Sequence, residues 1–135
     1  MSDNHRFTAL VADDESHILE LLSELLMIHG FKVFKAGDGE EAWDILKKIK
    51  KVDIVISDVF MPKMSGIELM KKIKRQIPAL PVILITAYIN KVNFGERNNG
   101  GVQPDGFFTK PFDIHRLIQK IDELLPQENL QSEPA

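Results

Sequence analysis

Three short apolar runs constrain the fold of this chain more than any other feature. They are rich in β-branched residues and continuous rather than alternating, as expected of strands buried on both faces, and they cover residues 7–12 (FTALVA), 53–58 (DIVISD) and 81–87 (PVILITA). Residues 30–36 (GFKVFKA) alternate more and suit an edge strand, and residues 106–110 (GFFTK) form a fifth, shorter candidate. The pattern predicts a five-stranded sheet with parallel central strands.

Amphipathic helical patterns separate most of these strands. Each pattern places apolar residues three or four positions apart on a single stripe, as in Ile18, Leu22, Leu25 and Leu26; Ala42, Ile45, Leu46 and Ile49; Ile67, Met70 and Ile73; and Leu117, Ile118, Ile121, Leu124 and Leu125. Residues typical of helix boundaries flank these patterns, namely Gly30, Asp38-Gly39, Ser65-Gly66, Pro78 and Asp113, the last as a candidate N-cap. Each helix should therefore cover the sheet with one apolar face.

The alternation of strands and helices with short connections predicts an α/β fold, a right-handed, doubly wound parallel sheet. Five strands suggest the flavodoxin-like order 2-1-3-4-5, which has its switch point between strands 1 and 3. In open α/β sheets, ligands bind outside the carboxyl ends of the strands at that point. The residues at those strand ends are therefore the candidates for a functional site.

Residues 88–106 depart from the regular pattern. A fourth helix is expected there, yet the segment holds three glycines before Gly106, four asparagines and a proline, which form helices poorly. We therefore expect an irregular or shortened fourth helix. The predicted domain covers residues 6–125, between an N-terminal tail (residues 1–5) and a polar C-terminal tail (residues 126–135, PQENLQSEPA).

Composition and charge narrow the functional classes. A chain of 135 residues with 44% apolar composition suits one domain with a packed core. The net charge is -3 and lysine and arginine are spread along the chain, so we expect no direct binding to nucleic acid. The absence of cysteine favours a cytoplasmic protein without thiolate metal ligands. No apolar run approaches the ~20 residues that span a bilayer, so no membrane segment is expected.

Polar residues follow four of the predicted strands. Strand 1 ends in Asp13 and Asp14, strand 3 in Asp58, strand 4 in Thr86 and strand 5 in Lys110. Three carboxylates brought together raise one another's pKa values unless a cation neutralises them. Oxygen ligands without cysteine favour Mg²⁺. With Mg²⁺ and one lysine ammonium the site would be nearly neutral and could accept a phosphoryl group.

Four segments together resemble the receiver domain of bacterial two-component response regulators, of which the chemotaxis regulator is the minimal single-domain example. They are VADDES (11–16), ISDVFMPKMSG (56–66), LITA (84–87) and FFTKPF (107–112), in the family's order and at nearly its spacing. Each segment alone is a weak signal, whereas the combination is specific. The resemblance spans roughly residues 6–125.

The resemblance implies roles for the acidic residues. Asp58 would be the phosphoacceptor. Mg²⁺ would be bound by Asp14, Asp58 and the backbone carbonyl of Phe60, with Asp13 assisting through a metal-bound water. The bulky Phe60 side chain is itself unusual, because many receivers have a polar or flexible residue two positions after the acceptor.

The resemblance also implies a switch and partners. Thr86 and Lys110 would hold the phosphoryl oxygens, Thr86 and Phe107 would move together as the switch, and the Lys110–Pro111 peptide would be cis. The phosphoryl donor would be a histidine kinase or a histidine phosphotransfer protein, and the signal would pass to an unidentified downstream protein. No enzymatic activity is implied beyond Mg²⁺-dependent self-phosphorylation and autodephosphorylation.

Other interpretations of these residues remain open. Asp13 or Asp14 could simply cap the first helix. A phosphatase of the haloacid-dehalogenase type would need a second aspartate two residues after Asp58, where this chain has Phe60. The stronger alternative is a receiver-like interaction module that works without phosphorylation. Enzymes that bind dinucleotides or nucleoside triphosphates are disfavoured, because the glycine-rich phosphate-binding motifs are missing.

Overall fold

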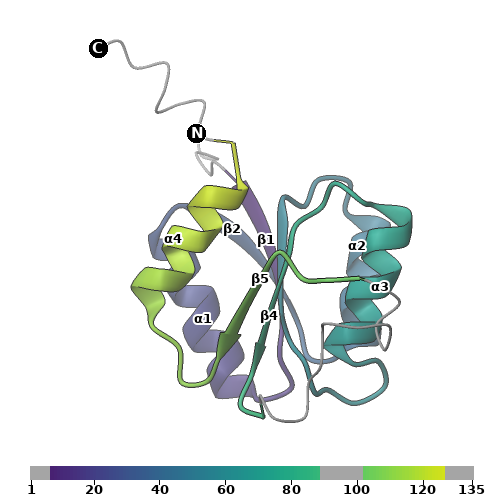
Figure 1. Ribbon diagram of the computed structural model, residues 1–135, viewed down its shortest axis with the longest axis horizontal. Helices are drawn as coiled ribbons and strands as arrows, with labels where there is room; N and C mark the ends of the chain where they lie inside the picture. The colour runs from purple at the N-terminus through teal and green to yellow at the C-terminus, as the bar shows by residue number, and fades with distance from the viewer. Residues whose placement is uncertain (1–6, 89–101, 127–135) are drawn as a thin grey trace.

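The computed structural model of the protein describes residues 7–88 and 102–126, which form a parallel sheet with helices on both faces (Figure 1). The strands are β1 (Phe7–Ala12), β2 (Phe31–Ala36), β3 (Ile54–Asp58), β4 (Val82–Thr86) and β5 (Gly106–Thr109). The helices are α1 (Ser16–Ile28), α2 (Gly39–Lys48), α3 (Gly66–Gln76) and α4 (Ile114–Leu124). The strand order is β2-β1-β3-β4-β5, with every pair parallel, which confirms the predicted topology.

Successive residues of the central strands point into two different cores. On β1, Ala9 and Val11 pack with α1 and α4, whereas Leu10 and Ala12 pack with α2 and α3. The same alternation holds along β3 and β4, so both faces of these strands are buried. Burial of each aliphatic side chain contributes about 1.5–3 kcal/mol. Two covered faces are the physical reason why the apolar runs in the sequence are continuous.

Three of the four helices begin where the sequence predicts. The Asp38 side chain accepts a hydrogen bond from the Glu41 amide at 2.8 Å at the start of α2. Ser65 and Glu68 form a reciprocal capping box at the start of α3. The Asp113 side chain accepts from the His115 amide at the start of α4. These caps fix where each helix leaves the carboxyl edge of the sheet.

Some of the predicted features fall outside the described residues. Most of the expected irregular fourth helix does so (residues 89–101), as do the predicted N-terminal tail and all but Pro126 of the C-terminal one. Residues 102–105 are described and lead into β5 without helical structure. Within the described part of the chain, no helix has the length and apolarity needed to cross a membrane.

Candidate functional site

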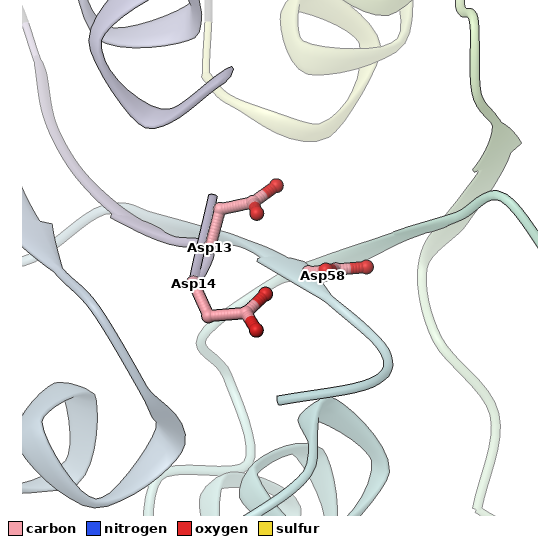
Figure 2. A group of neighbouring side chains, drawn as sticks. All are labelled: Asp13, Asp14 and Asp58. Atoms are coloured by element: carbon pink, nitrogen blue, oxygen red, sulfur yellow. The ribbon is translucent and has the colours of Figure 1, made fainter. Parts of the chain in front are cut away.

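Three carboxylates gather where β1 and β3 end. Asp13 and Asp14 directly follow β1, and Asp58 is the last residue of β3, which pairs with β1. One oxygen from each carboxylate lies within 4.8 Å of the other two (Figure 2). Asp13 and Asp58 are buried, at 4% and 8% exposure, whereas Asp14 is exposed. The predicted convergence of strand ends therefore forms an acidic cluster with one solvent-facing member.

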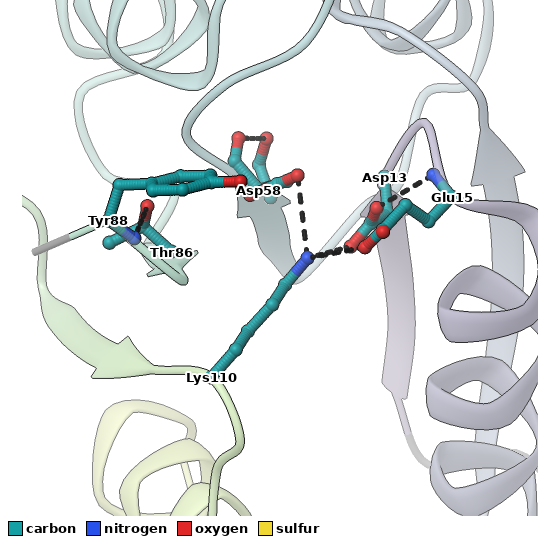
Figure 3. Close-up of polar contacts among 7 residues, drawn as sticks. Asp13, Glu15, Asp58, Thr86, Tyr88 and Lys110 are labelled. Atoms are coloured by element: carbon teal, nitrogen blue, oxygen red, sulfur yellow. Dashed lines mark hydrogen bonds and ion pairs between the residues drawn. The ribbon is translucent and has the colours of Figure 1, made fainter.

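Lys110 reaches this cluster from the end of β5. Its Nζ lies 3.0 Å from Asp13 Oδ2 and 3.5 Å from Asp58 Oδ2 (Figure 3). A third carboxylate, Glu15, lies 3.3 Å from the same ammonium group. Sequence reasoning did not place Glu15 in the site, although its position two residues after Asp13 is a usable signal. The Lys110–Pro111 peptide is cis, as the resemblance implied.

The helix-cap interpretation is wrong, because Asp13 bonds to the residue before α1 and not to an amide within the helix. Asp13 Oδ1 accepts a hydrogen bond from the Glu15 amide at 2.9 Å, just before α1 begins. The other oxygen of Asp13 accepts from Lys110 Nζ, so the residue both orders the chain at this turn and belongs to the charged cluster. The N-cap residue of α1 is Glu15, whose side chain makes no capping hydrogen bond.

The pKa values of the paired groups show how the negative charge is balanced. Burial and the charge of Asp13 raise the pKa of Asp58 from 3.8 to about 6, even though Lys110 and the Val59 amide act in the opposite direction. Burial by itself would lower the pKa of Lys110. The hydrogen bond that Lys110 donates to Asp13 and the charges of Asp58 and Asp13 outweigh burial and raise that pKa above its usual value. One ammonium group does not neutralise three or more carboxylates, so the acidic cluster retains an affinity for a further cation.

The donor set of this cluster suits a metal ion. Its ligand atoms are hard carboxylate oxygens, close enough together to share one ion. Burial without a full complement of countercharge makes the ionised form of Asp58 costly, and a divalent cation would remove that cost. The acidic cluster can therefore bind a metal ion.

Of the two predicted switch residues, Thr86 is more deeply buried than the carboxylates, whereas Phe107 is only partly buried. Thr86 ends β4 and is fully buried, and its Oγ1 accepts a hydrogen bond from the Tyr88 amide at 3.0 Å. The Thr86 carbonyl accepts from the Lys110 amide, which ties the end of β4 to the end of β5. Phe107 lies on β5 opposite Leu84 and packs, partly buried, against the core under α2 and α3. Neither side chain is part of the lining of the acidic cleft.

That cleft has a volume of about 200 Å³ and an aromatic rim. It is lined by Asp14, Glu15, Asp58, Phe60, Ala87, Tyr88 and Lys110. The rings of Phe60 and Tyr88 meet edge to face at 5.8 Å, and the two residues are 40% and 58% exposed. Sequence reasoning placed Tyr88 in the irregular segment rather than at the site. The signal was available, because Tyr88 and Phe60 each stand two residues beyond the ends of paired parallel strands.

The loop after β3 is held against the phosphoacceptor candidate by a glycine. The Gly66 amide donates to the Val59 carbonyl at 2.7 Å. A Cβ atom at residue 66 would lie 2.1 Å from the backbone oxygen of Asp58, closer than any side chain tolerates. Glycine at this position therefore lets α3 begin directly beside the end of β3.

We expect Gly66→Ala to displace this backbone and to lower the free energy of unfolding by about 1–3 kcal/mol, the usual range for forcing an atom into a packed region. Urea denaturation would measure the loss. Gly37→Ala is the matched control, because its Cβ would meet only Glu41 Oε1 at an ordinary 3.6 Å. Equal stability of the two variants would contradict this account of the loop.

Comparison with known proteins decides the family. The family model described as the response regulator receiver domain matches residues 9–122. The chain belongs to this receiver domain family. It is thus a receiver domain of two-component response regulators, and its curated relatives are regulators. A probable transcriptional regulatory protein TcrX of Mycobacterium tuberculosis is 34% identical over 92% of this chain and 52% of that protein. The transcriptional regulatory protein CpxR of Escherichia coli is 37% identical over 86% of this chain and 48% of its own length.

The receiver domain also resembles solved structures over most of its length. A response regulator receiver domain protein of Clostridium thermocellum has a TM-score of 0.78 at 28% identity, covering 93% of this chain and 98% of that one. The response regulator TrrA of Thermotoga maritima, solved in complex with Mg²⁺ and BeF, has a TM-score of 0.78 at 33% identity, covering 88% and 99%. The receiver domain spans about half the length of the curated relatives TcrX and CpxR.

Proposed function

We propose that Asp58 is the phosphoacceptor and that a histidine kinase or a histidine phosphotransfer protein is the donor. The observation that carries this proposal is the position of the Asp58 carboxylate: it lies in an open cleft, with Lys110 Nζ 3.5 Å from Oδ2. Receiver domains of response regulators interact with histidine kinases, which supports this donor class. We further propose a cytoplasmic location and a downstream protein, rather than nucleic acid or a membrane, as the recipient of the signal.

The residues around Asp58 suit transfer to a carboxylate. An Asp58 oxygen would form a bond to phosphorus while the bond from phosphorus to the donor imidazole nitrogen breaks, and that electron pair stays on the imidazole. With a pKa of about 6, Asp58 is largely ionised at neutral pH and can act as the nucleophile. Lys110 provides a fixed positive charge beside the phosphoryl oxygens, and such positioning and charge stabilisation account for most of the catalysis of this reaction.

We propose Mg²⁺ as the metal. Asp14, Asp58 and the Phe60 backbone carbonyl would hold it, with Asp13 acting through a bound water. When bound, the ion would neutralise and orient the phosphoryl oxygens. The complex of the Thermotoga relative with Mg²⁺ and BeF supports this choice. Self-phosphorylation and autodephosphorylation are the only reactions that we propose for this chain.

We propose Thr86 and Phe107 as the switch. Thr86 Oγ1 uses a lone pair to accept from the Tyr88 amide and retains its own proton. That proton can be donated to a phosphoryl oxygen if the end of β4 moves toward Asp58. Such a movement would carry Tyr88 with it and leave room beside Leu84. Phe107 lies opposite Leu84 on β5 and could repack into that room. The switch is thus a hydrogen bond formed at the site and a repacking at the edge of the sheet.

Incubation with acetyl phosphate and Mg²⁺, followed by intact mass measurement, tests the proposed function. One phosphoryl group per chain is the expected product, and peptide mapping should place it on Asp58. Beryllofluoride with Mg²⁺ should perturb the amide signals of residues at the same cleft. A chain that neither acquires a phosphoryl group from acetyl phosphate nor responds to beryllofluoride would instead be an interaction module that works without phosphorylation.

We expect Asp14→Ala to abolish most Mg²⁺ binding, because Asp14 is the solvent-facing carboxylate of the cluster. The wild-type affinity should be in the millimolar range or somewhat tighter, since few protein ligands hold a strongly hydrated ion. An NMR or calorimetric titration would measure both proteins. Asp44→Ala is the control, because Asp44 lies on α2 and pairs with Lys47. Equal Mg²⁺ affinity in wild type and Asp14→Ala would refute the ligand assignment.

We expect Phe60→Asn to accelerate loss of the phosphoryl group by about tenfold, which corresponds to an activation free energy of hydrolysis lowered by about 1.4 kcal/mol. Hydrolysis requires a water in line with the acyl phosphate, and the Phe60 and Tyr88 rings cover the rim of the cleft. Decay of the phosphorylated protein after removal of acetyl phosphate would measure the rate. Phe60→Leu keeps an apolar side chain and should change the rate less. An unchanged rate in Phe60→Asn would show that the ring does not control water access.

A further inference from the structure

The charges of this chain are unevenly distributed along its sequence. The net charge is -3, yet residues 39–76 contain nine lysines and arginines against six carboxylates. The remaining residues contain eight cationic side chains and fourteen carboxylates. Residues 39–76 include α2 and α3, which lie side by side on one face of the sheet (Figure 1). The segment that carries this face therefore has a net positive charge, whereas the rest of the sequence is acidic.

A groove of about 300 Å³ runs along α3 on this face, and we call it the basic groove. It is lined by Lys63, Met64, Glu68, Lys71, Lys72 and Arg75. Its one carboxylate, that of Glu68, is already engaged, because Oε1 accepts from the Ser65 amide at 3.0 Å in the capping box. Four cationic side chains and a methionine therefore define the surface that a ligand would meet.

The cations of the basic groove are poorly neutralised by the protein itself. Among the described residues, no carboxylate lies within 4.0 Å of Lys71 or Arg75. Lys63 lies 3.8 Å from Asp38, near the limit of an ion pair. Lys72 Nζ lies 5.4 Å over the ring of Trp43 on α2. An anionic ligand would thus gain charge complementarity without displacing strong internal pairs.

We propose that the basic groove is a docking site for a short acidic segment of a partner protein. Lys71 and Arg75 are one helical turn apart, so neighbouring carboxylates of a peptide can reach both. A long polyanion such as nucleic acid would extend beyond the groove and meet the acidic remainder of the domain. Physiological salt screens the repulsion between the polyanion and this acidic surface only at separations beyond about 8–10 Å. A short acidic peptide meets the basic face alone. This surface is distinct from the Asp58 cleft and does not depend on phosphorylation.

Hexaglutamate is the probe for this proposal, with hexaglutamine and an oligothymidylate of equal charge as comparisons. Amide chemical shifts of the full-length protein should change along α3, and the emission of Trp43, the single tryptophan, should follow the titration through its contact with Lys72. The double variant Lys71→Ala/Arg75→Ala should weaken binding by about tenfold. The matched control Lys32→Ala/Arg116→Ala removes the same charge from β2 and α4 and should bind like the wild type.

Two kinds of result would overturn the proposal. One is equal loss of hexaglutamate affinity in both double variants, which would show that only the net charge matters. The other is tighter binding of oligothymidylate than of hexaglutamate, which would assign the groove to nucleic acid. Thermal melts of each variant establish that it is folded. Unchanged phosphorylation of Asp58 in Lys71→Ala/Arg75→Ala is expected, so failure of this proposal is separable from failure of the proposed function.

Discussion

Asp58→Asn is expected to reduce phosphorylation by acetyl phosphate at least about a hundredfold, because an amide oxygen is a far weaker nucleophile than a carboxylate. The substitution preserves the shape of the side chain and leaves Lys110 paired with Asp13 and Glu15. The fold and the cleft should therefore persist while the chemistry is lost. Intact mass measurement at several times after mixing, with Mg²⁺ present, gives the initial rates of both proteins.

Two controls make that result specific to Asp58. Asp44→Asn removes a carboxylate from the surface of α2 and should be phosphorylated like the wild type. Omitting Mg²⁺ should slow the wild type strongly, because the phosphoryl oxygens then have only Lys110 to balance their charge. If Asp58→Asn and the wild type acquire the group at similar rates, another residue is the acceptor and the proposed function of Asp58 is wrong.

The metal-free protein is expected to lose stability as the pH rises from about 4 to about 6, through the titration of Asp58. Its pKa is raised from 3.8 to about 6 in the folded state, mainly by burial and then by Asp13. The folded state therefore favours the protonated carboxyl group. The resulting stability is fully present below the pKa of the unfolded state and is lost as the pH rises through the pKa of the folded state. The shift corresponds to a destabilisation of up to about 3 kcal/mol at neutral pH.

Asp58→Asn should remove the destabilisation caused by the buried, ionised carboxylate. The metal-free variant should therefore be more stable than the wild type at neutral pH and close to it in stability at pH 4. Urea denaturation at both pH values, with EDTA present, measures the difference in the free energy of unfolding. The contributions of the other carboxylates to the pH dependence largely cancel, because both proteins contain them. Added Mg²⁺ should stabilise the wild type and leave Asp58→Asn nearly unchanged. A variant that is less stable than the wild type at neutral pH would contradict this balance of charges.

The sequence by itself determined the sheet and the central part of the site. Continuous apolar runs arise only where both faces of a strand are covered, and Ile54, Val55 and Ile56 point alternately into the two cores. Helix starts at Asp38, Ser65 and Asp113 depend on side-chain to amide bonds within three residues. Such local signals can be identified without a structure. The strand order then places Asp13, Asp14, Asp58 and Lys110 at a single edge.

Tertiary structure alone decided which side chains meet beyond those strand ends. Glu15 joins Lys110 across 95 positions of sequence, and the edge of Phe60 meets Tyr88, because parallel register brings separate loops together. Thr86 proved fully buried, with its hydroxyl bonded to the Tyr88 amide. Lys72 lies over the ring of Trp43 because α2 and α3 pack on the same face of the sheet. The physical reason is that a sequence encodes local propensity and periodicity directly, whereas distances between remote side chains depend on register and helix packing.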